Sequence, residues 1–247
     1  MDCKFEVQGL KRILGESLLF SDINFTLSGS ERLFVTGPSG VGKTLFLRLL
    51  ACLDEAQGGE LRLNGKTPSD YGFPAWRALV TYVPQSRVNF KGTPAEFYFQ
   101  AQQFASQKGR PRGDLPTLIN DLGLEHVVLN QAWTELSGGQ AQRVAIAIAV
   151  ALRPAVLLLD EPTSACDQVS VRRVEKVLQD SGCTLIWISH DPEQPSRLGG
   201  KVLELPGGTL TDIAPALLAE AGGGSATSSS ERLEARLPVS AAVPAGL

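Results

Sequence analysis

Gly37-Pro38-Ser39-Gly40-Val41-Gly42-Lys43-Thr44 is the stretch that decides the fold of this 247-residue chain. It follows the apolar run 33–35 and opens into 45–50, which is apolar except for Arg48, an order that indicates strand, loop and helix. In that context G-x-x-x-x-G-K-[ST] predicts a phosphate-binding loop. Loop N–H groups and the helix dipole would face one anion, Lys43 would neutralise the β- and γ-phosphates, and the Thr44 hydroxyl would ligate Mg²⁺. We therefore predict nucleoside triphosphate binding, with an accidental glycine turn as the alternative.

The composition limits the class of protein. With 43% hydrophobic and 20% charged residues, the chain can bury the core of one α/β domain with a subdomain. The net charge of −3 supplies no basic field, so we expect no nucleic-acid partner. The longest apolar run, 144–152, is about half of a membrane span, and the N-terminus lacks a signal-peptide pattern. We expect a chain that does not cross a membrane by itself.

The four cysteines are far apart in the sequence, at Cys3, Cys52, Cys166 and Cys183. They form no C-x-x-C pair, and no clustered histidines accompany them. This pattern predicts reduced thiols in a cytosolic protein.

Apolar patterns predict strands that alternate with helices, and hence a parallel sheet. The strands expected in an antiparallel patch are 5–7, 18–20, 23–27 and 60–63. Those expected in the parallel sheet are 78–83, 155–159 and 184–188. Gly9, Gly15 and Gly29 would punctuate the first strands, and Asn64-Gly65 is a hairpin signal. Helices are expected over 170–178 and over most of 93–152, with breaks at 108–116 and around 137–139. We predict a domain over 1–220, with a helical subdomain at about 90–152, and a flexible Gly/Ser/Ala/Pro-rich tail over 221–247.

Two adjacent carboxylates, Asp160 and Glu161, follow the apolar run 156–159. Ligands bind at the carboxyl ends of strands in open α/β sheets, so both acids should arrive near the nucleotide. Asp160 would hold Mg²⁺ through water, and Glu161 would orient or deprotonate the attacking water. Solvated acids at a strand end are the alternative. Beside an intact phosphate loop, the pair predicts a hydrolase.

A second glycine-rich segment, Leu136-Ser137-Gly138-Gly139-Gln140, precedes the apolar helix pattern at 141–147. Ser137 is a good helix cap, and the glycines leave N–H groups accessible, which suits an anion. A helix cap without a ligand is the alternative reading.

Together these residues resemble the ATP-binding cassette ATPases over about 5–205. The features that occur in that family's order are the phosphate loop, Gln85, the signature 136–140, Asp160-Glu161, the segment 164–167 and His190. The resemblance implies an α/β phosphate-loop NTPase core with a parallel sheet, an antiparallel β patch and an inserted helical subdomain. It also implies that two cassettes, here expected as a homodimer, sandwich ATP and Mg²⁺. The signature of one, Ser137, Gly138, Gly139 and Gln140, would then close over the γ-phosphate held by the other.

The resemblance further implies roles for single residues. Gln85 would sense Mg²⁺ and the water, Asp167 would lie at the dimer seam, and His190 would contact the γ-phosphate. A lone histidine is ordinarily structural, yet His190 follows an apolar strand where the site should be. Two positions depart from the pattern: Cys166 stands where leucine is common, and 10–13 lack the aromatic residue that stacks on adenine. Arg12 is a candidate for that stacking, with a solvated surface arginine as the alternative.

A single cassette without a membrane span resembles the separate energy subunit of a transporter. It would act on the cytoplasmic face of a membrane and dock on an integral membrane subunit. Five aromatic side chains after Gln85 would mainly form the subdomain core, with one or two lining a groove for the partner: Phe90, Phe97, Tyr98, Phe99 and Phe104. A weaker resemblance is to bacterial iron exporters and plant aluminium-tolerance transporters. A soluble ATPase of iron–sulfur cluster assembly is the alternative function, and the substrate and direction of transport stay open.

Overall fold

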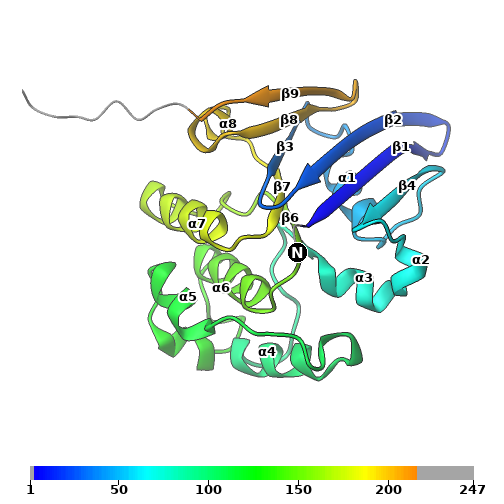
Figure 1. Cartoon of the computed structure of the whole chain (residues 1–247). Helices are drawn as coiled ribbons and strands as arrows, with labels where there is room; N and C mark the ends of the chain where they lie inside the picture. The colour runs from blue at the N-terminus through cyan, green and yellow to red at the C-terminus, as the bar shows by residue number, and fades with distance from the viewer. Residues whose placement is uncertain (1–2, 216–247) are drawn as a thin grey trace, which may run out of the picture. The chain divides into compact units, whose positions relative to one another are not determined.

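The computed structural model describes residues 3–215. These residues form two β-sheets with helices around them (Figure 1). The strands are β1 (Lys4–Leu14), β2 (Ser17–Ser28), β3 (Arg32–Thr36), β4 (Gly58–Leu63), β5 (Val80–Val83), β6 (Val156–Asp160), β7 (Thr184–Ile188), β8 (Gly200–Glu204) and β9 (Thr209–Ile213). The smaller sheet is antiparallel, in the order β2-β1-β4. The larger has the order β5-β6-β7-β3-β8-β9 and is parallel except for β9.

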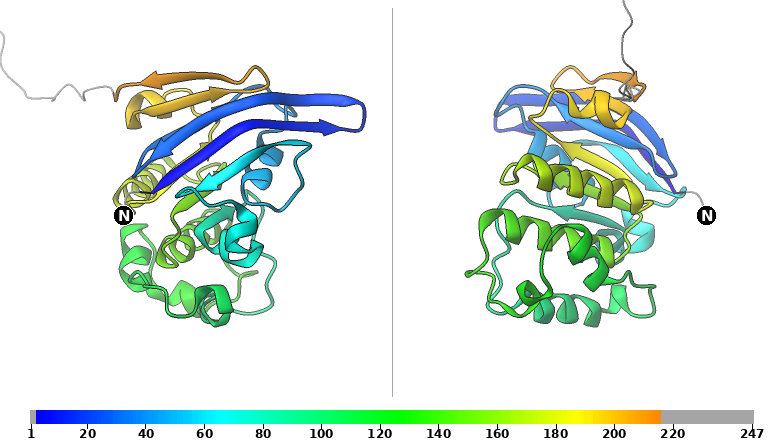
Figure 2. Two further views of the ribbon diagram at one scale, coloured as in Figure 1. Left: turned by 45° about the vertical axis from the view of Figure 1, so that its right-hand side comes forward. Right: turned by 90° about the vertical axis from the view of Figure 1, so that its left-hand side faces the viewer.

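Helices and the small sheet cover the two faces of the large sheet (Figure 2). The helices are α1 (Lys43–Leu50), α2 (Pro68–Tyr71), α3 (Phe73–Leu79), α4 (Pro94–Gln103), η1 (Ala105–Gln107), α5 (Leu115–Asp121), η2 (His126–Asn130), α6 (Gly138–Ala151), α7 (Gln168–Asp180) and α8 (Gln194–Leu198). Side chains alternate along a strand. In β7, Trp187 therefore packs with α6 and α7, whereas Ile186 packs with α1, β1 and β2.

The register of the parallel strands sets the position of the site. Val83 of β5 lies beside Leu159 of β6, and Asp160 lies beside Ile188 of β7. Val35 of β3 pairs in turn with Ile188. The carboxyl ends of four neighbouring strands thus meet at one edge, where the loops after them carry polar residues.

The parallel sheet and the antiparallel patch predicted from the sequence are confirmed. The strand predicted over 78–83 is wrong in its first two residues, since α3 continues to Leu79. The indole N–H of Trp76 donates to the Leu50 carbonyl at 2.9 Å and fixes that helix against α1. Gly9 does not end a strand, because β1 continues through an irregularity of register between Val7 and Leu10.

Other boundaries also differ from those expected. Asn64 and Gly65, at φ 52° and 78°, form a turn closed by Leu63 and Lys66, but α2 follows instead of a second strand. The edge strands β8 and β9 were not expected, because their short, mixed sequences lack a strong alternation. The predicted tail, 221–247, lies outside the described residues, so the domain boundary at 220 stays a prediction.

Between residues 3 and 215, no helix is both long and apolar enough to cross a bilayer. The four cysteines lie in this range and are free thiols. Burial raises the pKa of Cys183 and of Cys52, the latter to about 11, so both stay protonated at neutral pH.

Candidate active site

The glycine loop joins β3 to α1 and wraps around the Lys43 ammonium group. Its glycines Gly37, Gly40 and Gly42 have φ values of 132°, 79° and 101°, which residues with a side chain rarely adopt. A Cβ atom at Gly37 would also collide with the Leu205 carbonyl. The ammonium donates to the Gly37 and Pro38 carbonyl oxygens at 2.9 and 3.0 Å. The cation is therefore held inside the loop where an anion would sit.

The loop backbone has donors available for such an anion. Among the described residues, the N–H groups of Ser39, Gly40 and Gly42 have no hydrogen-bond acceptor. Lys43 is buried, and Thr44 is exposed in the first turn of α1. Free N–H groups, a helix start and a buried cation together fit a polyphosphate.

Three predicted catalytic residues meet at neighbouring strand ends. The Gln85 amide, after β5, donates to Glu161 Oε2 at 2.6 Å. His190 Nε2, after β7, lies 2.6 Å from Glu161 Oε1. Glu161, directly after β6, therefore has both carboxylate oxygens engaged by groups 76 and 29 residues away in sequence.

The backbone of Glu161 is fixed on both sides. Its φ of 49° is unusual for a residue other than glycine. Its N–H donates to the Ile188 carbonyl at 3.1 Å, and its own carbonyl accepts the Gln142 amide at 2.7 Å. This conformation turns the side chain from the strand toward Gln85 and His190, and outliers of this kind cluster at functional sites.

Asp160 is buried at the end of β6, with 3% of its surface exposed. The Tyr82 hydroxyl donates to its Oδ2 at 2.8 Å. Burial, and then the hydrogen bond to Asp160, raise the pKa of Tyr82, so the phenol stays protonated. One carboxylate oxygen is therefore anchored by Tyr82.

The predicted Mg²⁺ ligands, Thr44, Gln85 and Asp160, offer the oxygen atoms that Mg²⁺ prefers. Within residues 3–215, no three His, Cys, Asp or Glu side chains gather to hold a metal by themselves. The donor set therefore fits Mg²⁺ only if phosphate oxygens and water complete its shell, which is usual for this ion.

A cavity of about 400 Å³ opens beside the loop. Its lining combines loop residues with Glu161, His190 and, from the β1–β2 hairpin, Leu14 and Leu19. Arg12 is not part of this lining, and its guanidinium donates to the Glu55 carbonyl. Leu14 and Leu19 therefore line this cavity and the Arg12 side chain does not, and the predicted contact of Arg12 with adenine stays a prediction.

The predicted signature caps α6 but lies outside this cavity. Ser137 Oγ accepts the Gln140 N–H at 3.2 Å, and the Gln140 side chain accepts the Ser137 N–H at 2.9 Å. A Cβ atom at Gly139 would lie 2.7 Å from the Ala165 carbonyl oxygen, so only glycine fits against the segment 164–167. Within one chain, Ser137, Gly138, Gly139 and Gln140 are not among the residues that line the cavity beside the phosphate loop.

Sequence reasoning missed four contributors to this region: Tyr82, Gln142, Leu14 and Leu19. Tyr82 had a weak signal, because it precedes Gln85 in an apolar run. Gln142 links α6 to two segments: it donates to Glu161 and accepts the Ala165 N–H at 3.3 Å. A polar residue in the apolar run 141–152 was the signal available for it.

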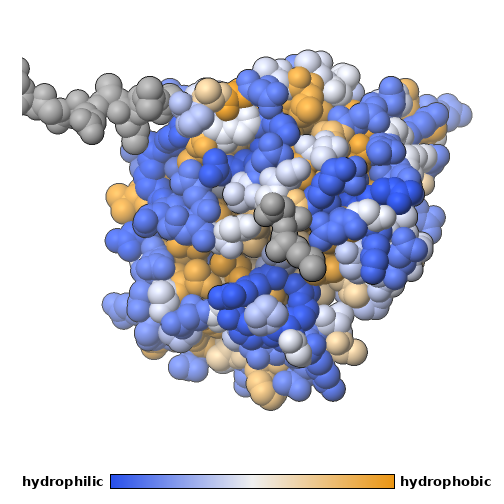
Figure 3. Space-filling model, viewed as in Figure 1, coloured by the Kyte–Doolittle hydropathy of each residue, from blue (hydrophilic) through white to orange (hydrophobic). Residues whose placement is uncertain are grey.

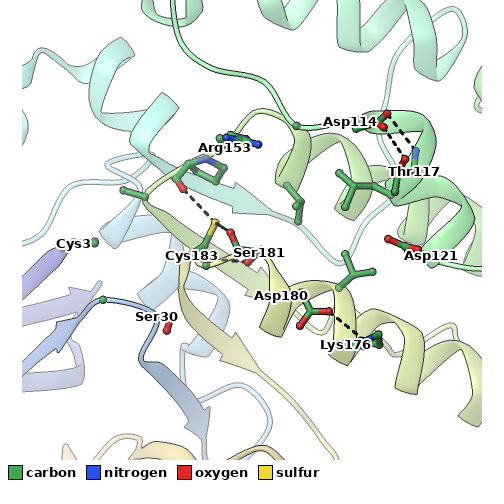
Figure 4. Close-up of a pocket in the computed structure, with 18 of the residues that line it drawn as sticks. Cys3, Ser30, Asp114, Thr117, Asp121, Arg153, Lys176, Asp180, Ser181 and Cys183 are labelled. Atoms are coloured by element: carbon green, nitrogen blue, oxygen red, sulfur yellow. Dashed lines mark hydrogen bonds and ion pairs between the residues drawn. The ribbon is translucent and has the colours of Figure 1, made fainter. Parts of the chain in front are cut away.

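The larger cavity, about 1160 Å³, lies at the opposite ends of the strands and contains none of the predicted site residues (Figure 4). Some of its polar groups are engaged with one another: Asp114 with Thr117, and Lys176 with Asp180 at 3.4 Å. The Cys183 thiol contacts the Pro154 carbonyl at 3.2 Å. We place the chemistry in the smaller cavity, because there the loop with its buried lysine and free N–H groups lies beside the Glu161 carboxylate.

The fold and this site define a phosphate-loop nucleotide-binding domain. A family model described as ABC transporter matches residues 20–164, and the chain belongs to this family. A spermidine/putrescine import ATP-binding protein, PotA, of Mannheimia succiniciproducens is 34% identical over 83% of this chain and 56% of its own length. An Fe(3+) ions import ATP-binding protein, FbpC 2, of Pectobacterium atrosepticum is 34% identical over 83% and 61%.

A solved structure with the same fold is an ATP binding subunit of an ABC transporter, with a TM-score of 0.75 at 21% identity. The likeness covers 85% of this chain and 90% of that one. The chain spans little more than half the length of the two curated relatives.

Proposed function

We propose that this chain is the ATP-binding subunit of an ABC transporter and hydrolyses ATP at composite sites of a cassette dimer. The observation that carries the proposal is the contact of Gln85, Glu161 and His190 beside the phosphate loop. Family membership supports it, and so do the relatives named as ATP-binding proteins. Hydrolysis would drive transport by a separate membrane subunit.

In this proposal each side chain of the site has a defined role. Lys43 and the loop N–H groups hold the phosphates, and Glu161 orients the attacking water and accepts its proton. Gln85 and His190 keep both Glu161 oxygens in place, and His190 lies near the γ-phosphate. Mg²⁺, held through Thr44, Gln85 and Asp160, would neutralise charge between the β- and γ-phosphates when bound.

The signature would act on the nucleotide of a second cassette. Ser137 and Gly138 start a helix of 14 residues, and the glycines leave its first N–H groups open to an anion. Since these residues lie outside the cavity of their own chain, a second copy would have to bring them to the γ-phosphate. Asp167, which caps α7 by accepting the Ser170 N–H at 2.9 Å, would lie at the seam.

The aromatic side chains after Gln85 form a packed group and an exposed group. Phe90, Phe97 and Tyr98 pack against the helical core, and Phe97 lies edge-on to Trp133. Phe99 and Phe104 are exposed, and we propose them as contacts for the membrane subunit. Figure 3 shows mostly polar side chains on one face of the molecule, with apolar side chains in separate patches.

The relatives support transport over the iron–sulfur alternative, because their names describe import proteins. We therefore propose import, at the cytoplasmic face of a membrane. Their substrates differ, so no substrate is assigned. The weaker likeness to iron exporters stays a prediction.

Purification of the tagged chain from detergent-solubilised membranes tests this proposal. We expect an integral membrane protein to accompany the parent chain, and MgATP hydrolysis to be measurable in the complex. The matched variant Phe99→Ala/Phe104→Ala should keep ATP binding and lose the membrane protein. A parent chain that binds no ATP, or that associates only with iron–sulfur assembly proteins, would overturn it.

A first prediction concerns adenine, which we propose packs on Leu14 and Leu19 and not on Arg12. Leu14→Ala should weaken ATP binding by about 1 kcal/mol, or roughly fivefold, because it removes an apolar contact. Leu14→Tyr should retain or improve binding by stacking. GTP should compete almost as well as ATP, since aliphatic side chains make no hydrogen bonds with the edges of the base.

The control is Leu18→Ala, which removes an exposed leucine of the same hairpin that does not line the cavity. Titration of a fluorescent ATP analogue gives each affinity. If Arg12→Ala weakened ATP binding and Leu14→Ala did not, the adenine contact would be assigned to Arg12 and not to the two leucines.

A further inference from the structure

An ionic cluster around a buried carboxylate includes Asp191, the neighbour of His190 in sequence, and its members do not line the smaller cavity. Its centre is Glu175 of α7, whose surface is 3% exposed. The carboxylate accepts Arg197 Nη2 at 2.5 Å, the Gln194 amide at 2.9 Å, and Arg172 Nη1 at 3.2 Å. Burial alone would raise the pKa of this carboxyl, but the hydrogen bonds from Arg197 and Gln194 lower it, so it stays ionised.

Arg197 of α8 joins this carboxylate to a second one. Its Nη2 also donates to Asp191 Oδ2 at 2.8 Å, while its Nε donates to Glu175 Oε2 at 3.2 Å. Flanked by two carboxylates, the guanidinium is 16% exposed. A planar guanidinium can bridge two carboxylates in a fixed geometry, which a lysine ammonium cannot reproduce.

Asp191 directly follows His190, so the bridge acts on the loop that carries the histidine. The Asp191 N–H donates to Ser189 Oγ at 3.0 Å, and its Oδ1 accepts the Glu193 N–H at 2.9 Å. The His190 ring is itself 58% exposed and has Glu161 as its hydrogen-bond partner among the described residues. The direction in which the His190 ring points therefore depends on the loop backbone that Asp191 anchors.

We propose that Arg197 is a positioning residue for His190, tying the loop after β7 to α7 through Asp191 and Glu175. The inference rests on the proposed function, in which the His190–Glu161 pair is catalytic. A buried ion pair is weak evidence for stability, because desolvation offsets its attraction. Its geometric effect is specific: Asp167 caps the start of α7, so the same helix would align the dimer seam and the histidine.

The first variant is Asp191→Asn, chosen because Asp191 is 40% exposed and its change leaves the Glu175–Arg197 pair intact. We expect kcat for ATP to fall about tenfold with KM within about twofold, since small misplacement of a catalytic group costs up to ~10² in rate. Glu193→Gln is the matched control, a neighbouring acid whose side chain does not bond Arg197, and should behave as the parent. Arg197→Lys should match Asp191→Asn, because an ammonium lacks the planar fork and cannot reproduce the three hydrogen bonds of Arg197 in this geometry.

A second readout does not depend on activity. The chain has two histidines, so His126→Gln assigns the ring NMR signals of His190. These signals should shift in Asp191→Asn and Arg197→Lys and stay unchanged in Glu193→Gln. Parental kcat and parental His190 signals in Asp191→Asn would overturn the inference. A parent without ATP hydrolysis would overturn the proposed function instead, and the ring signals would still decide whether Arg197 positions His190.

Discussion

Glu161→Gln is expected to lower the rate of ATP hydrolysis by about 10²- to 10⁴-fold, the usual contribution of a positioned general base. Glutamine keeps the shape of the side chain and an oxygen that can accept the Gln85 amide, now 2.6 Å away. It loses the basic carboxylate beside the attacking water. Single-turnover hydrolysis with MgATP in excess of its Kd separates this loss of rate from any loss of binding.

The same variant should stabilise the closed dimer. Removing one negative charge near the γ-phosphate relieves like-charge repulsion, so the ATP-bound sandwich should last longer. On a sizing column with MgATP, we expect Glu161→Gln to shift from monomer to dimer. Adding Ser137→Arg should reverse the shift, because a long side chain at the start of α6 would block the approach to phosphate.

Glu125→Gln is the control for charge alone, since Glu125 is exposed and outside the cavity. It should hydrolyse ATP at the parental rate. Parental hydrolysis by Glu161→Gln would remove Glu161 from catalysis. A dimer that persists with Ser137→Arg would show that the contact is not made through the signature.

Lys43→Ala is expected to weaken ATP binding by about ten- to a hundredfold or more. The ammonium now donates to the Gly37 and Pro38 carbonyls, and phosphate oxygens would take over these donors. Each hydrogen bond to a charged group contributes about 1.5–3 kcal/mol, and a triphosphate would lose its nearest cation. Isothermal titration with ATP measures the change directly.

The matched control is Lys176→Ala, an exposed lysine that lines the larger cavity and pairs with Asp180. Its ATP affinity should equal that of the parent, and so should its unfolding temperature. Unchanged affinity in Lys43→Ala, with a folded protein, would contradict the assignment of the loop.

The sequence by itself determined the features whose signal is local. The glycine loop between a strand and a helix, the cap at Ser137 and the strand over 184–188 follow from the spacing of a few neighbouring residues, and all lie as expected. Local patterns fail where packing decides, as at Leu79, which continues α3 because Trp76 anchors that helix on α1.

Only the tertiary structure decided which distant residues meet. Gln85, Glu161 and His190 follow different strands, and their contact depends on the order β5-β6-β7 and on the register between these strands. Leu14 faces the cavity while Arg12 bonds Glu55, although the two residues belong to one strand. Arg197 likewise binds Glu175 across 22 residues of sequence. Such contacts depend on strand pairing and side-chain direction, which arise from packing of the whole domain and leave no local signal in the chain.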